Sequence, residues 1–243
     1  TDELYHYLGL AYHQLNRSAK ATAILEKIEP ENRKVEDWMA LGSSYFAQKK
    51  YQKAVEALLP AKAESEIAHL LGKAYIYLNQ PQDGMPFLTK AIEVGSEEAE
   101  LYHMRGAIFY DQKLYQPALA DIQRAQELGW TDGKNYALLG GAQYYLDQFP
   151  AAVENLEKAL SKSEKTDEVY YTLGNAQAKA GNITKALPNL KEAVKLGRGD
   201  KITYRHLGEG EYQAKNYTGA VEALDLAVQE GVTDLRVYEQ LGN

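Results

Sequence analysis

The residues of this chain that are best suited to chemistry are five histidines, nineteen tyrosines and many carboxylates, because the sequence contains no cysteine. The absence of cysteine excludes disulfides, thiolate nucleophiles and cysteine-based zinc sites. The sequence also has no nucleophile-elbow motif, no phosphate-binding glycine loop and no His-Glu-x-x-His motif. We therefore predict that the chain is not an enzyme and that it needs no cofactor.

The charge balance makes nucleic acid a poor partner. The chain has 27 Lys and Arg against 34 Asp and Glu, a net charge of -7, so no excess positive charge is available to neutralise phosphates. Hydrophobic residues make up 45% of the chain, which indicates a folded protein. The sequence shows neither an apolar run of about 18 residues nor a signal peptide. We expect a soluble chain without membrane insertion, and the sequence does not distinguish the cytoplasm from a bacterial periplasm.

The elements that position these side chains belong to a repeat. One glycine recurs at intervals of 33, 30, 34, 34, 34, 34 and 34 residues, at Gly9, Gly42, Gly72, Gly106, Gly140, Gly174, Gly208 and Gly242. A fixed period near 34 indicates a repeat array. With this glycine at position 8, repeats 1 to 7 span residues 2–34, 35–64, 65–98, 99–132, 133–166, 167–200 and 201–234, and a partial eighth spans 235–243. We expect a single array over residues 1–243.

Each repeat contains two segments with helical spacing. Apolar residues recur at positions 4, 7, 8 and 11, and again at positions 20, 24 and 27, as in two amphipathic helices. Small residues at positions 8, 20 and 27 let the helices approach closely, and large residues at positions 4, 11, 17 and 24 fill the remaining space. We therefore assign the tyrosines at positions 4, 11 and 17 to the core. One helix pair cannot bury its own apolar faces, so neighbouring repeats must stack.

Helix ends are also predictable from the repeat. Position 31 calls for positive φ after a helix, and it is occupied by Gly95, Gly129, Gly197 and Gly231. Candidate N-caps of the following helices are Asp132, Thr166, Asp200 and Asp234. Four prolines are expected in the linker or the first turn of the second helix, where a missing N–H costs least: Pro81, Pro117, Pro150 and Pro188.

Residues 37–61 carry the most complete version of the pattern, with Trp38, Leu41-Gly42, Tyr45, Tyr51, Ala54 and Ala61. This pattern resembles the tetratricopeptide repeat, and the resemblance covers nearly the whole chain. It implies an all-α fold, a right-handed α-solenoid of helix-turn-helix repeats with seven units and a partial eighth. It also implies that first helices line a concave groove and that second helices form the convex back.

The chain departs from this family at two places. The usual proline at position 32 is replaced by Ser96, Trp130, Arg198 and Val232. The second interval is four residues short, and repeat 3 carries Pro81, Gly84 and Pro86 where helix formers are expected. We therefore predict an irregular joint near residues 59–66.

Positions 2, 5, 6, 9, 12 and 13 form an arc of the first helix that stacking does not need, and by the resemblance this arc faces the groove. All five histidines lie on the arc, at His6, His13, His69, His103 and His206. Seven tyrosines lie there too: Tyr7, Tyr77, Tyr110, Tyr144, Tyr145, Tyr171 and Tyr212. They are either half-buried residues shaped by neighbouring helices or an aromatic lining that binds a partner.

We favour the aromatic lining, because otherwise an apolar patch would stay in contact with water. The predicted contact residues are Tyr77, His103, Tyr110, Tyr144, Tyr145, Tyr171, Asn175, Arg205, His206, Glu209 and Tyr212. An extended peptide would lay its side chains between the rings, while Asn175 and Arg205 would bind its backbone or a carboxylate.

Two other uses of these positions are disfavoured. His69 and His103 share position 5 in consecutive repeats, too far apart for one zinc ion held at about 2 Å by each ligand, so we expect no metal. Metal-free histidines near their usual pKa of about 6.5 would still make binding sensitive to pH. Family members that clamp the terminal carboxylate of chaperone tails carry a set of Lys, Asn and Arg residues, of which only Asn175 has a match here.

The sequence thus predicts a non-catalytic scaffold that binds an extended peptide or a partner helix in an aromatic-lined groove. The alternative is a structural element of a larger complex, such as a bacterial secretion or polysaccharide export machine. Such an element would associate through its array ends, with self-association at the C-terminal end through Tyr238 and Leu241. A polysaccharide on the tyrosine faces is a further possible ligand.

Overall fold

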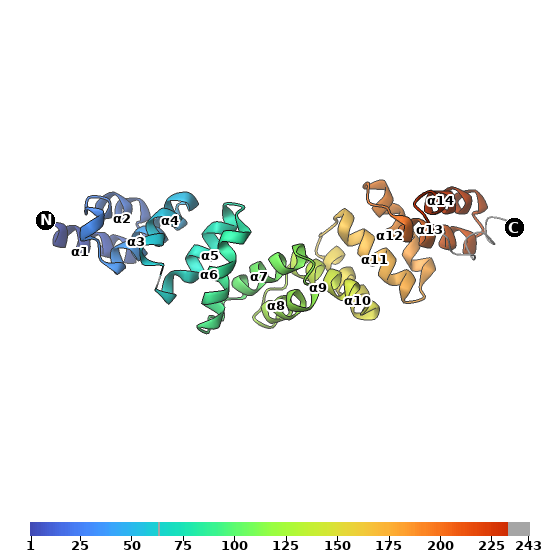
Figure 1. Ribbon diagram of the computed structural model, residues 1–243, viewed down its shortest axis with the longest axis horizontal. Coiled ribbons are helices and arrows are strands. Elements are labelled where there is room, and N and C mark those ends of the chain that lie inside the picture. Colours follow the sequence, from blue (N-terminus) through green and yellow to red (C-terminus); the bar gives the residue numbers. More distant parts are fainter. Residues whose placement is uncertain (63, 233–243) are drawn as a thin grey trace. The chain divides into compact units, whose positions relative to one another are not determined.

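The computed structural model describes residues 1–62 and 64–232, which form α-helices and short 3-10 helices and no strand. The α-helices follow one another as pairs joined by tight turns (Figure 1). The pairs are α1 (Asp2–Gln14) with α2 (Ser18–Leu25), α3 (Val35–Ala47) with α4 (Tyr51–Leu58), α5 (Ala68–Tyr77) with α6 (Pro81–Glu93), α7 (Ala99–Asp111) with α8 (Tyr115–Glu127), α9 (Gly133–Tyr145) with α10 (Phe149–Ser161), α11 (Asp167–Lys179) with α12 (Ile183–Lys195), and α13 (Lys201–Gln213) with α14 (Tyr217–Gln229).

The chain divides into two compact bodies, and the division falls inside α7. The N-terminal body comprises residues 1–108, and the described part of the C-terminal body comprises residues 109–232. Within each body a helix packs against its partner in the pair and against the next pair; α11, for example, contacts α9, α10, α12 and α13. The fold is therefore an all-α solenoid of helix-turn-helix repeats. The division of residues 1–243 into individual repeats stays a prediction.

The recurring glycine at position 8 allows the two helices of a pair to make close contact. A Cβ atom added at this glycine would overlap a leucine of the second helix that is almost completely buried. The contact recurs between Gly9 and Leu25, Gly42 and Leu58, Gly72 and Leu88, Gly140 and Leu156, Gly174 and Leu190, and Gly208 and Leu224. The predicted close approach through small residues is confirmed, and these leucines form the centre of the core.

The predicted helix ends are confirmed where the structure describes them. The four glycines at position 31 have φ between 87° and 98°. Asp132 accepts a hydrogen bond from the backbone N–H of Asn135, Thr166 accepts one from Val169, and Asp200 accepts from Ile202 and Thr203. The fourth candidate cap, Asp234, lies outside the described residues.

One proline is placed differently from the prediction. Pro81 and Pro150 lie at the start of their helices and Pro117 is the third residue of α8, but Pro188 lies inside α12. The tight turn explains the difference. The residue at position 15 adopts positive φ and reverses the chain within two residues, so the second helix begins at position 17 in this repeat. Position 22 therefore falls in the second turn of the helix, and Pro86 inside α6 occupies the same position.

The predicted irregular joint is confirmed. Within it, the chain forms the 3-10 helices η2 (Leu59–Ala61) and η3 (Ser65–Ile67) instead of continuing the α-helices. As a result, α5 begins at Ala68, later in its repeat than the other first helices. A third 3-10 helix, η1 (Pro30–Asn32), connects α2 to α3.

The assignment of the tyrosines at positions 4, 11 and 17 to the core is wrong in part. Tyr45 is buried, but most of this set is half-buried and Tyr217 is 58% exposed. Two tyrosines of the groove arc, Tyr144 and Tyr171, are instead buried at 9% exposure each. The reason is that rings on the arc pack against one another across neighbouring first helices, which the spacing within one helix does not reveal.

Candidate ligand-binding surface

A cluster of tyrosine rings lies where α7, α8 and α9 meet in the C-terminal body. The rings of Tyr115 and Tyr145 are stacked, with centroids 4.4 Å apart and an interplanar angle of 11°. Tyr110 makes T-shaped contacts with both, at centroid distances of 5.6 and 6.2 Å. Offset-stacked and edge-to-face arrangements of this kind are the favourable ones for aromatic pairs. Tyr110 and Tyr145 were predicted for the site, whereas Tyr115 was assigned to the framework.

Two hydroxyls of this cluster converge on one carboxylate. Tyr110 and Tyr145 both donate to Glu168 Oε1, at 3.0 and 3.1 Å, and Arg198 forms an ion pair with the other oxygen of Glu168. Arg198 also lies 3.6 Å from Asp167 and 4.8 Å above the ring of Tyr171. Glu168 and Arg198 were not among the predicted site residues. Glu168 stands on the groove arc at position 2, but Arg198 lies in a joint where the sequence showed only a missing proline.

The hydrogen bond from Tyr110 to Glu168 joins two repeats that are not neighbours. It crosses repeat 5 at Gly141, where an added Cβ atom would overlap the Tyr110 hydroxyl. Most contacts in a repeat array connect adjacent repeats only. Gly141 therefore permits a longer-range link that a side chain at this position would block.

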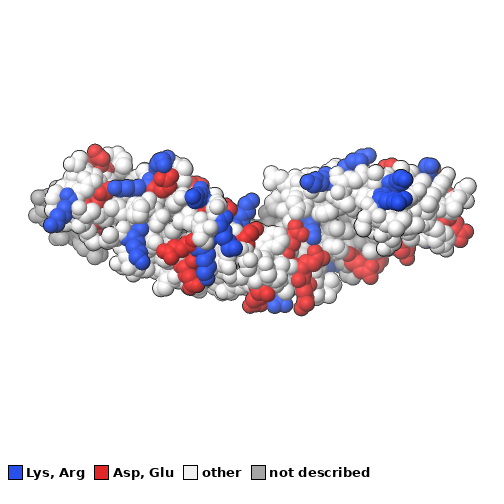
Figure 2. Space-filling view, turned by 180° about the vertical axis from the view of Figure 1, so that it is seen from behind, with Lys and Arg blue, Asp and Glu red and all other residues white. Residues whose placement is uncertain are grey.

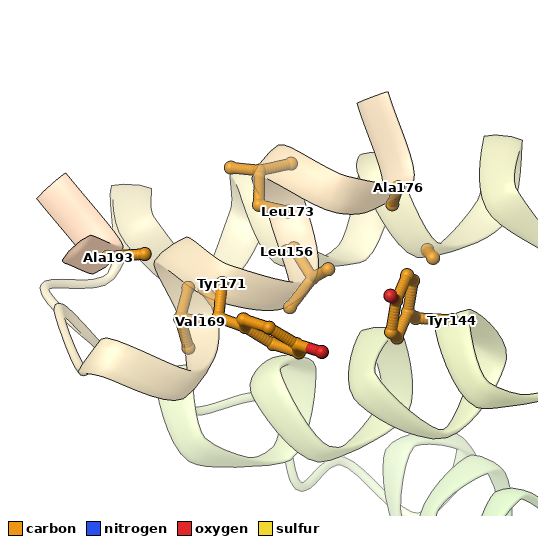
Figure 3. Packing of buried hydrophobic residues seen from close by; sticks show 9 residues of the cluster. Tyr144, Leu156, Val169, Tyr171, Leu173, Ala176 and Ala193 are labelled. Atoms are coloured by element: carbon orange, nitrogen blue, oxygen red, sulfur yellow. The ribbon is translucent and has the colours of Figure 1, made fainter. Parts of the chain in front are cut away.

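Tyr144 and Tyr171 form the buried side of the surface. Their rings meet edge to face with centroids 6.2 Å apart, and Figure 3 shows them beside Val169 and Leu156 of the apolar core. The Tyr171 hydroxyl donates to Asp200 at 2.9 Å. The two rings are thus held by packing and by a carboxylate, which makes them the fixed floor of the surface.

Asn175 and His206 belong to a buried polar network between α11 and α13. The amide nitrogen of Asn175 donates to the Tyr171 carbonyl at 2.9 Å and to Thr203 Oγ1 at 3.0 Å. Its amide oxygen lies 2.8 Å from His206 Nδ1, and Thr203 Oγ1 in turn donates to Asp200. Asn175 is 0% exposed and His206 3%. The prediction that they contact a ligand does not fit this burial, because their polar atoms are already used inside the protein.

The titration of these groups favours hydrogen bonding over proton transfer. Burial, followed by the charge of Glu168, raises the pKa of Tyr110 and Tyr145, and burial raises the pKa of Tyr144 to about 12. These phenols remain neutral donors near neutral pH. Burial and then the nearby Arg205 lower the pKa of His206 to about 4, so its imidazole is neutral as well.

The remaining predicted residues are distributed over both bodies. Tyr212 meets Tyr217 edge to face at 5.6 Å, and Arg205 lies 3.7 Å from Glu209 one turn further along α13. His103 is half-buried on α7. In the N-terminal body, Tyr77 is 47% exposed and stacks on Tyr51 with centroids 4.8 Å apart.

One face of the molecule carries charges of both signs. On the face shown in Figure 2, Lys and Arg are interspersed with Asp and Glu. Among the described residues no group of three or more His, Asp or Glu side chains is arranged to hold a metal ion. The helices of residues 1–62 and 64–232 include none that is long and apolar enough to cross a membrane.

The helix pairs pack through glycine, stack on one another and carry aromatic rings on their first helices. This architecture defines a helical repeat protein. Family profiles described as Tetratricopeptide repeat match residues 138–200 and 171–232, and a second profile of the same description matches residues 35–58. The chain belongs to the tetratricopeptide repeat family. A sequence search against curated proteins finds no match.

Several solved structures share the fold at low sequence identity. YrrB, a tetratricopeptide repeat protein with an unusual peptide-binding site, is 20% identical and has a TM-score of 0.58, covering 77% of this chain and 97% of its own. MamA from AMB-1 is 18% identical with a TM-score of 0.58, covering 68% of this chain and 93% of its own. A repeat protein of Cytophaga hutchinsonii is 21% identical with a TM-score of 0.51 and covers 98% and 99% of the two chains.

Proposed function

We propose that the chain is a non-catalytic protein-interaction scaffold that binds an extended peptide across the tyrosine rings of its first helices. The observation that carries this proposal is the convergence of Tyr110 and Tyr145 on Glu168, with Tyr115 stacked on Tyr145, next to the buried rings of Tyr144 and Tyr171. Rigid aromatic rings that are held in place lose little conformational freedom when a partner binds.

The half-buried rings are the contact residues in this proposal. Tyr145 and Tyr212 present ring surface, Arg205 and Glu209 supply polar groups on α13, and His103 is a separate candidate contact in the N-terminal body. Asn175 and His206 act indirectly, because they hold α11 against α13 and so fix Tyr171. Peptide binding by the structurally similar YrrB supports a peptide as the ligand class.

The test is selection of short random peptides on the intact chain, followed by binding measurements on variants. Tyr145→Ala and Tyr212→Ala should each weaken the selected peptides by about fivefold or more, because truncating an aromatic anchor costs more than about 1 kcal/mol. Tyr136→Ala is the matched control, since this half-buried ring of α9 contacts Lys158 and Lys162 instead of Glu168. Peptides that bind all three variants equally would contradict the proposal.

A second candidate function, assembly into a larger complex, is favoured by an exposed apolar face of α1. Leu4, Tyr7 and Leu8 are 67%, 61% and 37% exposed, although residues at these helix positions are mostly covered in the other repeats. Light scattering over a range of concentrations tests it: association that disappears in Leu4→Glu with Leu8→Glu supports assembly. The C-terminal residues first considered for this role, Tyr238 and Leu241, lie outside the described residues.

A further inference from the structure

The N-terminal body contains an aromatic cluster that repeats the C-terminal one in detail. Phe46 makes T-shaped contacts with Tyr51 and Tyr77 at 5.3 and 5.8 Å, while Tyr51 and Tyr77 stack with an interplanar angle of 17°. The Tyr77 hydroxyl donates to Glu100 at 2.8 Å. We call Phe46, Tyr51, Tyr77, Lys73, Glu98 and Glu100 the N-terminal site.

The C-terminal site consists of Tyr110, Tyr115, Tyr145, Asp167, Glu168 and Arg198. Each aromatic residue has the same place in its repeat as its counterpart: position 12, position 17, and position 13 of the following repeat. The accepting glutamate lies at position 2 of the repeat after that, in both sites. The spacing is thus reproduced over three consecutive repeats, once in each body.

One difference between the sites is compensated within each of them. In the C-terminal site the Tyr110 hydroxyl reaches Glu168 over the vacant side of Gly141. In the N-terminal site Phe46 has no hydroxyl, and Lys73, the counterpart of Gly141, binds Glu100 at 2.6 Å. Both glutamates therefore receive a second donor, by different routes. The arrangement around the glutamate is maintained although the residues that build it have changed.

The charge beside the stacked rings also has the same sign. Lys73 lies between Glu98 and Glu100, at 3.1 and 2.6 Å, and Arg198 lies between Asp167 and Glu168. One cation between two carboxylates leaves each site with a net negative charge. An anionic group next to aromatic faces favours a cationic side chain, which gains attraction from the carboxylates and from the rings.

We propose that the chain has two equivalent sites, one in each body, and that each takes a lysine or arginine side chain of a partner peptide. This inference rests on the proposed peptide-binding function and specifies its ligand as a basic peptide with more than one cationic anchor.

The experiment uses N-acetylarginine amide as the probe and its neutral analogue N-acetylcitrulline amide as the control, with NMR signals of the tyrosine rings in the full chain as the readout. Arginine amide should shift the rings of Tyr77 and Tyr145 in a saturable manner. The citrulline analogue should bind roughly three- to thirtyfold more weakly, the range expected for a lost cation–π contact.

Charge variants distinguish a ligand-binding site from a cluster that only stabilises the fold. Glu100→Gln should weaken arginine amide at Tyr77 and leave Tyr145 unchanged, and Glu168→Gln should do the reverse. Neither substitution should change citrulline binding. Because Gln keeps the size of Glu, these variants test the charge without removing a ring. Tyr75→Leu is the control for α5, since Tyr75 stacks on Phe87 and is not part of the N-terminal site.

Three results would overturn the inference: no saturable shift at either ring, equal binding of both probes, or binding that ignores the glutamate substitutions. If the selected peptides bind the chain but are not displaced by arginine amide, the proposed function stands and the basic-anchor inference fails. If no peptide can be selected at all while arginine amide still binds, the proposed peptide function fails and the cation sites remain.

Discussion

At the scale of single residues, Gly141 has the most specific requirement. Its missing side chain leaves room for the Tyr110 hydroxyl. We predict that Gly141→Ala lowers the free energy of unfolding by about 1 to 3 kcal/mol, the usual cost of overpacking. Urea denaturation of the full chain measures this value.

The companion variant is Tyr110→Phe, which removes the hydroxyl that the new methyl group would meet. Alone it should cost about 1.5 to 3 kcal/mol, because a hydrogen bond to the charged Glu168 is lost. Combined with Gly141→Ala it should cost clearly less than the sum of the two single changes. Strict additivity would show that Gly141 and Tyr110 do not share the space.

A second residue-scale prediction concerns His206 and pH. Its pKa is about 4 in the folded protein, lowered first by burial and then by Arg205, against about 6.5 when unfolded. Between pH 6.5 and 4, His206 is therefore protonated in the unfolded state and neutral in the folded state. The free energy of unfolding falls as the pH drops through this range. The loss amounts to about 3 kcal/mol at most.

His206→Asn provides the control for this pH dependence. The variant removes the titrating group, so its stability should change less over the same pH range. Burial also lowers the pKa of His13, which contributes in the same direction in both proteins and cancels in the comparison. Identical pH profiles for the two chains would show that His206 does not cause the pH dependence of stability.

Residue types were predictable from the sequence, whereas residue partners were not. The repeat placed Tyr110, Tyr145 and Tyr171 on one arc, because an amino acid's position on a helix follows from its number. It could not show that Arg198 reaches Glu168 and Tyr171, since this depends on how a joint is folded between two repeats. It also could not show that Asn175 is completely buried, because burial depends on the neighbouring helix.

At the scale of elements, the helix ends were predictable where a residue type has one dominant use, as with glycine caps and aspartate N-caps. The turns within the pairs were harder to predict. Residues at position 15 adopt positive φ, and three of them are the lysines Lys49, Lys113 and Lys215. Lysine has no preference for this conformation. The tight turn is imposed by the two packed helices, and the local residue tolerates it.

Pro188 gives the element-scale prediction. It is exposed and lies inside α12, where it cannot donate a backbone hydrogen bond to the carbonyl four residues earlier. Pro188→Ala should raise the free energy of unfolding by about 1 to 3 kcal/mol. Thermal unfolding measures the change, and Pro86→Ala in α6 is the parallel test because Pro86 is also exposed at the same repeat position. A loss of stability in both variants would contradict the prediction that these prolines destabilise their helices.

At the scale of the whole molecule, the repeat period was sufficient to predict an all-α solenoid, because the position-8 glycine and its leucine solve the same packing problem in successive pairs. The two equivalent sites were not predictable from one repeat alone, since each is built from three. They emerge only when Phe46, Tyr77 and Glu100 are compared with Tyr110, Tyr145 and Glu168 in space.

In a repeat array, a helix that is covered by fewer neighbours opens more readily than one covered on both sides. In α1 the side chains of Leu4 and Leu8 are partly in water, whereas α11 is covered by helices of the preceding and the following pair. We predict that amide hydrogens of α1 exchange through an opening that costs on the order of 2 kcal/mol less than the opening of α11, a difference of about thirtyfold in rate.

Hydrogen exchange followed by mass spectrometry of the full chain measures both helices in one experiment, with α13 as an internal comparison. Equal protection of α1 and α11 would mean that the array unfolds as one cooperative unit, and the exposed leucines of α1 would then have no part in its stability.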